Sequence, residues 1–148
     1  MIQLQFSTQR AFSSACIRWF TDSPVSHVDV VMPDGSLLGS LSDGGVQIRP
    51  SEYANWSKVI VAEVDADFDA IWTFLKAQIG KPYDRTAIVS FALSRNWRED
   101  DSWFCSELVA AAFESAGLPL KNPNWPFAKV TPADLLKSPL VKYNQGDL

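Results

Sequence analysis

The chain has few of the residues that bind metals or form cross-links. Its 148 residues include two cysteines, Cys16 and Cys105, and a single histidine, His27. Two cysteines far apart in the sequence do not form a disulfide framework, and no C-x-x-C pair is present. A zinc site would need all three residues and a carboxylate, without the usual paired spacings. We therefore expect no metal and no other cofactor, because G-x-G-x-x-G and P-loop sequences are missing as well.

Basic charge and long apolar runs are also scarce. The chain has 13 Lys and Arg against 17 Asp and Glu, a net charge of −4, and no basic run. Nucleic-acid binding depends on a basic surface that displaces counterions, so we expect no nucleic-acid partner. No apolar stretch approaches the roughly 18 residues of a membrane-spanning helix. The first residues lack the basic and apolar regions of a signal peptide, so we expect a cytoplasmic or phage-encoded protein without a transmembrane segment.

What is present is the composition of one globular domain over residues 1–148. Apolar residues make up 47% of the chain and charged residues 20%. Short apolar or alternating runs between turn residues predict strands at 2–6, 27–32, 36–41, 46–49 and 58–64. The last four of these strands are expected to form an antiparallel meander. The strand at 58–64 is expected to be more buried than the others, because its apolar run is continuous.

The apolar period changes to that of a helix after these runs. Apolar residues at i, i+3, i+4 and i+7 predict a helix over 67–79, and the clearest apolar face predicts a helix over 104–116. Strands that come first and helices that flank them indicate the α+β class. Weaker patterns predict helices at 13–20, at 86–93 and from Thr131, and a sheet-edge segment at 141–143.

Cys105 stands out because it begins the clearest helix. The unpaired N–H groups at a helix N-terminus carry about half a positive charge, which favours thiolate over thiol. Such placement lowers the pKa of a cysteine from ~8.5 to about 3.5–7.5, and the same N–H groups can stabilise an oxyanion. The alternative is a small buried residue on an amphipathic helix. Cys16 lies among apolar residues and is interpreted as a buried, inert thiol.

His27 supplies the base that a cysteine nucleophile needs. It begins a predicted strand, and Asp29 lies two residues further on, so both side chains project from the same face of the sheet. An acid in that place can orient the imidazole. The alternatives are a structural histidine and a solvated strand face. Ser40 on the next strand is a weaker candidate for the orienting group, and Glu107 can instead cap the helix of Cys105 or pair with a basic side chain.

Several segments together resemble the circularly permuted NlpC-type papain-like cysteine amidases and peptidases. The similarity is greatest to the YiiX-like branch of that family and to phage-associated relatives. In papain-like enzymes the cysteine helix precedes the histidine strand, whereas here His27 precedes Cys105, as in the permuted group. The segments are S-H-V-D-V-V (26–31), P-D-G (33–35), G-G-V-Q-I-R-P (44–50), G-K-P-Y-D (80–84), W-F-C-S-E-L-V (103–109) and V-T-P-A-D-L (130–135).

The resemblance implies a permuted papain-like fold, an antiparallel sheet or partial barrel packed against helices. Cys105 is then at a helix N-terminus and His27 on a strand. The implied activity is that of a thiol hydrolase, in which Cys105 attacks a carbonyl carbon and His27 takes and later returns a proton. The resemblance also implies that the N–H of Cys105 is part of the oxyanion hole and that Tyr83 lies near the site. Ser106 and Trp103, which flank Cys105 closely in the sequence, are further candidates for oxyanion and substrate binding, and the alternative for Trp103 is core packing.

The chain departs from the family at the orienting acid. YiiX-like members often carry a glutamate on the second strand, in a V-x-E-A-type segment, where this chain has L-L-G-S (37–40). Many relatives have a small residue at the position of Asp29. Either Asp29 has taken over the orienting role or the triad is incomplete.

The resemblance leaves the substrate open, because a fold does not choose one. The first interpretation is an amidase or peptidase that acts on a peptide or a small substrate of the cell-wall type. The second is an acyltransferase or thioesterase that uses the same two residues. The third is a non-catalytic binding or structural module, such as a phage virion component, and it is motivated by the missing glutamate.

Overall fold

The computed structural model describes residues 1–9, 24–84, 103–121 and 130–144. The helices predicted at 13–20 and 86–93, and Cys16, lie outside these ranges. The described elements are β1 (Ile2–Gln9), β2 (His27–Val31), β3 (Leu37–Leu41), β4 (Gly45–Arg49), β5 (Trp56–Val64), α2 (Phe68–Gln78), α4 (Cys105–Ser115) and α5 (Pro132–Leu136).

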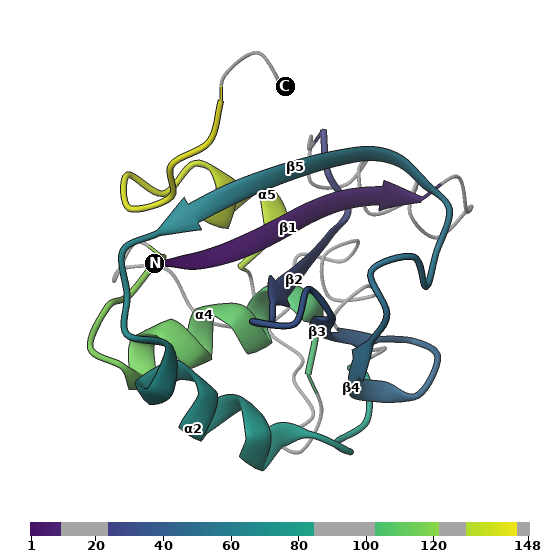
Figure 1. Ribbon diagram of the computed structural model, residues 1–148, viewed down its shortest axis with the longest axis horizontal. Coiled ribbons are helices and arrows are strands. Elements are labelled where there is room, and N and C mark those ends of the chain that lie inside the picture. Colours follow the sequence, from purple (N-terminus) through teal and green to yellow (C-terminus); the bar gives the residue numbers. More distant parts are fainter. Residues whose placement is uncertain (10–23, 85–102, 122–129, 145–148) are drawn as a thin grey trace.

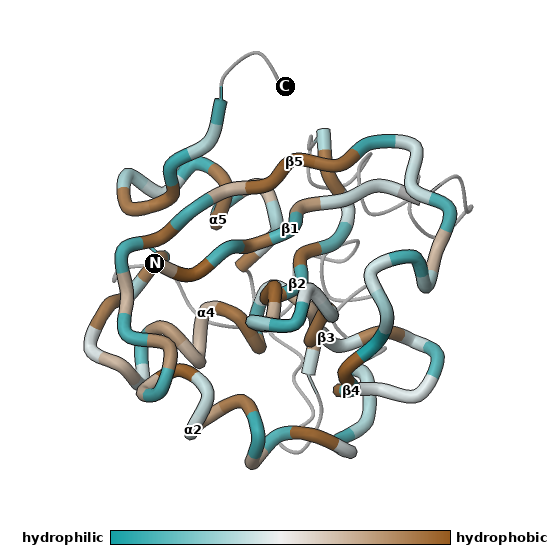
Figure 2. The backbone as a smooth tube through the Cα atoms, viewed as in Figure 1, coloured by the Kyte–Doolittle hydropathy of each residue, from teal (hydrophilic) through white to brown (hydrophobic). Residues whose placement is uncertain are grey.

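The described strands form one antiparallel sheet in the order β4-β3-β2-β1-β5, which confirms the α+β class (Figure 1). Helix α4 packs against β2 and β3, and α2 packs against α4. On the face of the sheet that forms the core, Leu4 of β1 lies opposite Val30 of β2, and Phe6 lies opposite Val28. The hydrophobic residues in Figure 2 follow this pattern, because they concentrate along α4 and the central strands.

The predicted meander is wrong in its last step, because β5 pairs with β1 and not with β4. The outer edge of β4 is already occupied by the chain that follows α2. The N–H of Val46 donates to Lys81 O at 2.9 Å, and the N–H of Gly80 donates to Val46 O at 2.9 Å. The backbones come so close that a Cβ on Gly45 would lie 2.2 Å from Lys81 O. No tight turn joins β4 to β5, so β5 crosses to the other edge of the sheet.

The greater burial predicted for β5 is also wrong. Ile60 and Ala62 are buried in the core, but Val59 and Val61 are 40% and 45% exposed. The strand therefore alternates between a covered and an open face, as strands at a sheet edge commonly do. The prediction for 141–143 is confirmed, since Lys142 pairs with Glu63 at the outer edge of β5.

The helices begin and end close to their predicted limits because local signals mark them. Asp67 caps α2 by accepting a hydrogen bond from the N–H of Asp69. Thr131 caps α5 in the same way through Asp134, with Pro132 at the first helical position. Gly117 follows α4 with φ +75°, a conformation that glycine adopts without strain.

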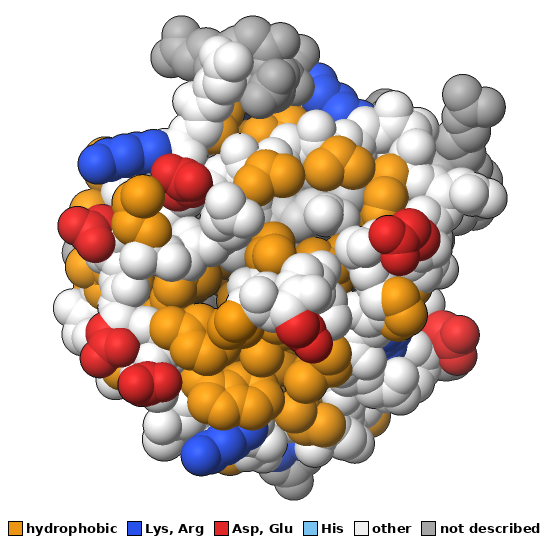
Figure 3. Space-filling model, in the orientation of Figure 1, with side chains coloured by type: hydrophobic (Ala, Val, Ile, Leu, Met, Phe, Trp, Pro, Cys, Tyr) orange, Lys and Arg blue, Asp and Glu red, His pale blue; other side chains and the backbone are white. Residues whose placement is uncertain are grey.

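One face of the molecule is largely hydrophobic around α2 and α4 (Figure 3). Within α2, Phe68 and Trp72 stack with their ring centroids 6.3 Å apart. Of the described helices, none has the length and apolar character needed to cross a membrane. The titratable residues considered next lie at the starts of β2 and α4.

Candidate functional site

The structure brings together the single histidine and one of the two cysteines. Cys105 is the first residue of α4 and its reduced thiol is 1% exposed. His27 is the first residue of β2 and is 6% exposed. The side chain of Cys105 lies close enough to the imidazole that its charge raises the pKa of His27. Two segments that are far apart in the sequence therefore place a thiol at a helix N-terminus beside an imidazole.

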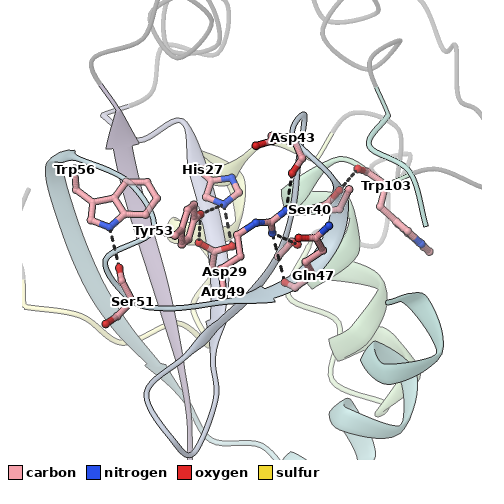
Figure 4. Close-up of polar contacts among 12 residues, drawn as sticks. His27, Asp29, Ser40, Asp43, Gln47, Arg49, Ser51, Tyr53, Trp56 and Trp103 are labelled. Carbon is pink, nitrogen blue, oxygen red and sulfur yellow. Dashed lines mark hydrogen bonds and ion pairs between the residues drawn. The ribbon is translucent and has the colours of Figure 1, made fainter. Parts of the chain in front are cut away.

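Asp29 contacts the other side of the histidine ring. His27 Nε2 lies 2.9 Å from Asp29 Oδ1, and both side chains are buried (Figure 4). The alternation predicted from the sequence holds here, since Val28 and Val30 lie in the hydrophobic core. Asp29 is 1% exposed, so it does not belong to a solvated strand face. Because Asp29 engages Nε2, Nδ1 is the ring nitrogen that remains for another partner.

The charges around His27 change its protonation. Burial is the largest single influence and lowers the pKa of the imidazole. The charges of Asp29 and Cys105, and the hydrogen bonds to both, act in the opposite direction and together raise the pKa of His27 to about 10. The ring is therefore an imidazolium at neutral pH when Cys105 is a thiolate. A protonated imidazole beside a thiol is an arrangement that can serve acyl transfer, with the thiol as nucleophile and the ring as proton donor.

Tyr53 is a site residue that sequence reasoning missed. It lies between β4 and β5, and its hydroxyl is 2.9 Å from Asp29 Oδ2 and 3.2 Å from His27 Nε2 (Figure 4). Burial and the charge of Asp29 raise the pKa of Tyr53 well above its ordinary value, so the hydroxyl keeps its proton. No local motif marks this loop tyrosine, because it meets Asp29 only through the fold.

Two further side chains surround this group. The indole of Trp56 lies nearly parallel to the ring of His27, with centroids 6.4 Å apart and an angle of 9°, and it meets the ring of Tyr53 edge-on at 5.0 Å. The guanidinium of Arg49 lies 5.6 Å from the centroid of the Tyr53 ring. The imidazole is thus enclosed by aromatic rings on the side of the β4–β5 loop.

Gly39 of β3 provides the space for the Asp29 carboxylate. A Cβ at this position would lie 1.8 Å from Asp29 Oδ1, a distance that real atoms do not tolerate. Gly39 is also within the segment where the family resemblance expects a glutamate. In this chain the acidic residue beside the histidine, Asp29, is therefore on β2, and the small residue, Gly39, is on β3. Ser40 donates its hydroxyl to Trp103 O at 2.6 Å, so its observed contact is with the backbone before α4 and not with His27.

Tyr83 lies near the thiol. Burial raises its pKa well above the ordinary value, and the charges of Cys105, Asp84 and Glu107 raise the pKa further. The ring packs against Phe104, with centroids 5.8 Å apart. Among the candidates for the oxyanion and substrate site, Tyr83 therefore interacts electrostatically with Cys105.

The described contacts of Ser106 and Trp103 are with other parts of the fold. The Ser106 hydroxyl donates to Val130 O at 2.5 Å, which ties the start of α4 to the segment before α5. The indole N–H of Trp103 donates to Gln78 Oε1 at 3.0 Å, and so the ring faces α2. Glu107 accepts a hydrogen bond from the N–H of Phe104 at 3.4 Å, which is the capping role considered from the sequence.

Comparison with known proteins gives a structural neighbour. No family model matches the chain, and no curated protein sequence matches it. Among solved structures, the chain is similar to the crystal structure of the metalloprotein YiiX from Escherichia coli O157:H7, with 20% sequence identity and a TM-score of 0.73. The match covers 97% of this chain and 94% of the other. At this identity the similarity shows a YiiX-like fold.

Proposed function

We propose that this chain is a cysteine amidase or peptidase with a permuted papain-like, NlpC-type fold. The observation that carries the proposal is that His27 contacts the Asp29 carboxylate at 2.9 Å while the charge of Cys105 acts on the same ring. Each member has the neighbour that its role requires: the thiol has a helix N-terminus and a base, and the base has an orienting acid. The burial of all three keeps their charges from being screened by water.

The proposed reaction is an acyl transfer in two steps. The thiolate of Cys105 attacks the carbonyl carbon of an amide, and the N–H groups at the start of α4, with Tyr83, stabilise the oxyanion. The C–N bond then breaks while the imidazolium of His27 gives its proton to the leaving amine. In the second step His27 takes a proton from water, which attacks the thioester and releases the acid. Asp29 holds the ring through Nε2 in both steps.

The proposed substrate is a peptide or a small peptide of the cell-wall type, as the family resemblance implies. One fold can host many activities, so the structural neighbour does not indicate the substrate. The proposed substrate class rests on the residues of the site and on the family resemblance.

A metal has no part in the proposed mechanism, although the structural neighbour is called a metalloprotein. Within the described ranges, no group of three His, Cys, Asp or Glu side chains is placed to hold an ion. The donors at this site are also engaged, since Asp29 gives one oxygen to His27 and the other to Tyr53. The described residues therefore do not fit a metal centre.

Acyl-enzyme trapping tests the proposal. The wild type, Cys105→Ala, His27→Ala and the control Cys16→Ser are incubated with a panel of peptide amides, cell-wall-type peptides and their thioesters. We expect hydrolysis by the wild type and by Cys16→Ser, and a covalent acyl adduct on Cys105 in intact-mass spectra. Cys105→Ala and His27→Ala should lose most of the activity. Full turnover by Cys105→Ala would refute the proposal, and turnover of thioesters without amides would indicate the acyltransferase or thioesterase alternative.

A further inference from the structure

The loop between β4 and β5 places a hydroxyl against the carboxylate of the site. The backbone N–H of Tyr53 donates to Pro50 O at 3.1 Å, which turns the chain in this loop. The hydroxyl of Tyr53 donates to Asp29 Oδ2, and its oxygen lies near His27 Nε2. Since a carboxylate accepts hydrogen bonds and cannot donate them, the tyrosine proton goes to Asp29 and the oxygen lone pairs face the Nε2–H.

Neighbouring groups hold the ring of Tyr53 in place. The edge of Trp56 packs on one side, and the guanidinium of Arg49 lies over the ring. That guanidinium is itself fixed, because it donates to the backbone carbonyls of Asp43 at 2.8 Å and of Gly45 at 3.0 Å. The position of the hydroxyl is therefore set by the β3–β4 hairpin and the start of β5.

We propose that Tyr53 is a positioning residue: its hydroxyl holds the Asp29 carboxylate charged and oriented, and so keeps the ring of His27 directed at Cys105. This inference rests on the function proposed above. The two oxygens of Asp29 then have separate tasks, since Oδ1 binds the ring and Oδ2 binds the tyrosine. Without the hydroxyl, Oδ2 loses its hydrogen-bond donor in a buried place, which disfavours the charged form of the carboxylate.

The proposal makes the reactivity of Cys105 depend on Tyr53 at acidic pH. The ionisable groups that face the hydroxyl are Asp29 and His27 from β2, Arg49 from β4 and Cys105 from α4. Of these, Asp29 is the group that accepts its proton. A protonated Asp29 no longer stabilises the imidazolium, and the thiolate loses its counter-charge. The acidic limb of thiolate reactivity should therefore move to higher pH when the hydroxyl is removed.

The test is the variant Tyr53→Phe, which keeps the ring and removes the oxygen. The rate of iodoacetamide alkylation at Cys105 is measured against pH in the intact chain by site-resolved mass spectrometry. A hydrogen bond to an ionised group changes an equilibrium by about tenfold or more. We expect the acidic midpoint to rise by about one pH unit, the rate at pH values well below both midpoints to fall about tenfold, and the rate at high pH to stay the same. Tyr143→Phe, the same change in a tyrosine away from the site, should match the wild type.

A second comparison shows whether the effect passes through Asp29. In an Asp29→Ala background, Tyr53→Phe should cause no additional shift of the midpoint. An additional shift of a full pH unit there would overturn the proposed role. So would a pH profile of Tyr53→Phe that coincides with those of the wild type and Tyr143→Phe.

The two proposals fail in different ways. If wild-type Cys105 reacts as an ordinary thiol whether or not His27 is present, the proposed function fails and the role of Tyr53 fails with it. If wild-type Cys105 is activated by His27 but Tyr53→Phe leaves the profile unchanged, the role of Tyr53 alone is refuted.

Discussion

A single methyl group at position 39 should break the contact between Asp29 and His27 without altering either residue. In Gly39→Ala the new Cβ would lie 1.8 Å from Asp29 Oδ1, whereas real Cβ atoms keep at least 3.0 Å from other heavy atoms. The carboxylate must therefore retreat by about 1.2 Å, the difference between these two distances. Gly39 is not among the glycines with a positive φ, so alanine adds no backbone strain at this position.

The retreat is large enough to cost the hydrogen bond. A 2.9 Å contact that lengthens by much of this amount passes beyond ~3.5 Å, where a hydrogen bond is no longer effective. A hydrogen bond to a charged group contributes about 1.5–3 kcal/mol, and one pKa unit corresponds to about 1.4 kcal/mol. We therefore expect the pKa of His27, which is about 10 in the folded chain, to fall by about one to two units in Gly39→Ala.

The assay is an NMR titration of the imidazole, which needs no assignment because the chain has one histidine. Asp29→Ala serves as the matched control, since it removes the same contact directly. In the Asp29→Ala background, Gly39→Ala should cause no further change in the pKa of His27. If Asp29→Ala lowers the pKa and Gly39→Ala alone does not, the steric reasoning is refuted.

Three further predictions concern the same group. Moving the acid to the facing strand, in Asp29→Ala combined with Gly39→Glu, should restore part of the His27 pKa that Asp29→Ala loses, as measured by the same titration. Stability should fall at alkaline pH: the imidazolium is favoured in the folded state, so its contribution is complete below the unfolded pKa of about 6.5 and is lost as pH rises towards 10. Urea unfolding should show a slope of at most about 1.4 kcal/mol per pH unit in this window, and the slope should be reduced in His27→Gln. Asp29→Asn should slow alkylation of Cys105 at pH 6, though less than His27→Ala does, because it alters the orienting group and leaves the base; an unchanged rate would remove Asp29 from the proposed triad.

The features that the sequence predicts correctly are those with local causes. The 3.6-residue apolar period locates both ends of α2 and α4 to within one residue. The two-residue alternation places His27 and Asp29 on one face, and the structure puts them in contact. The apolar period also predicts a helix that begins at residue 104 and so places Cys105 at its N-terminus, as the structure has it.

The features that the sequence does not predict arise from contacts between distant segments. The partner of β5 depends on the chain after α2, which occupies the edge of β4. No sequence motif marks Tyr53 as a site residue, because its contact with Asp29 joins the β4–β5 loop to a strand 24 residues earlier in the chain. In the sequence, Gly39 belongs to the segment where the glutamate of the family pattern is absent. The structure shows what this glycine does: it makes room for the Asp29 carboxylate.

The most direct test of the central claim is the reactivity of Cys105 in the native chain. Alkylation by iodoacetamide is followed against pH at both cysteines, so that Cys16 is an internal reference, in the wild type and in His27→Ala. An activated thiolate predicts rapid alkylation of Cys105 near pH 6, slow alkylation of Cys16, and loss of the difference in His27→Ala. Alkylation of Cys105 that begins only near pH 8.5 and does not depend on His27 would contradict the claim and favour a binding or structural role.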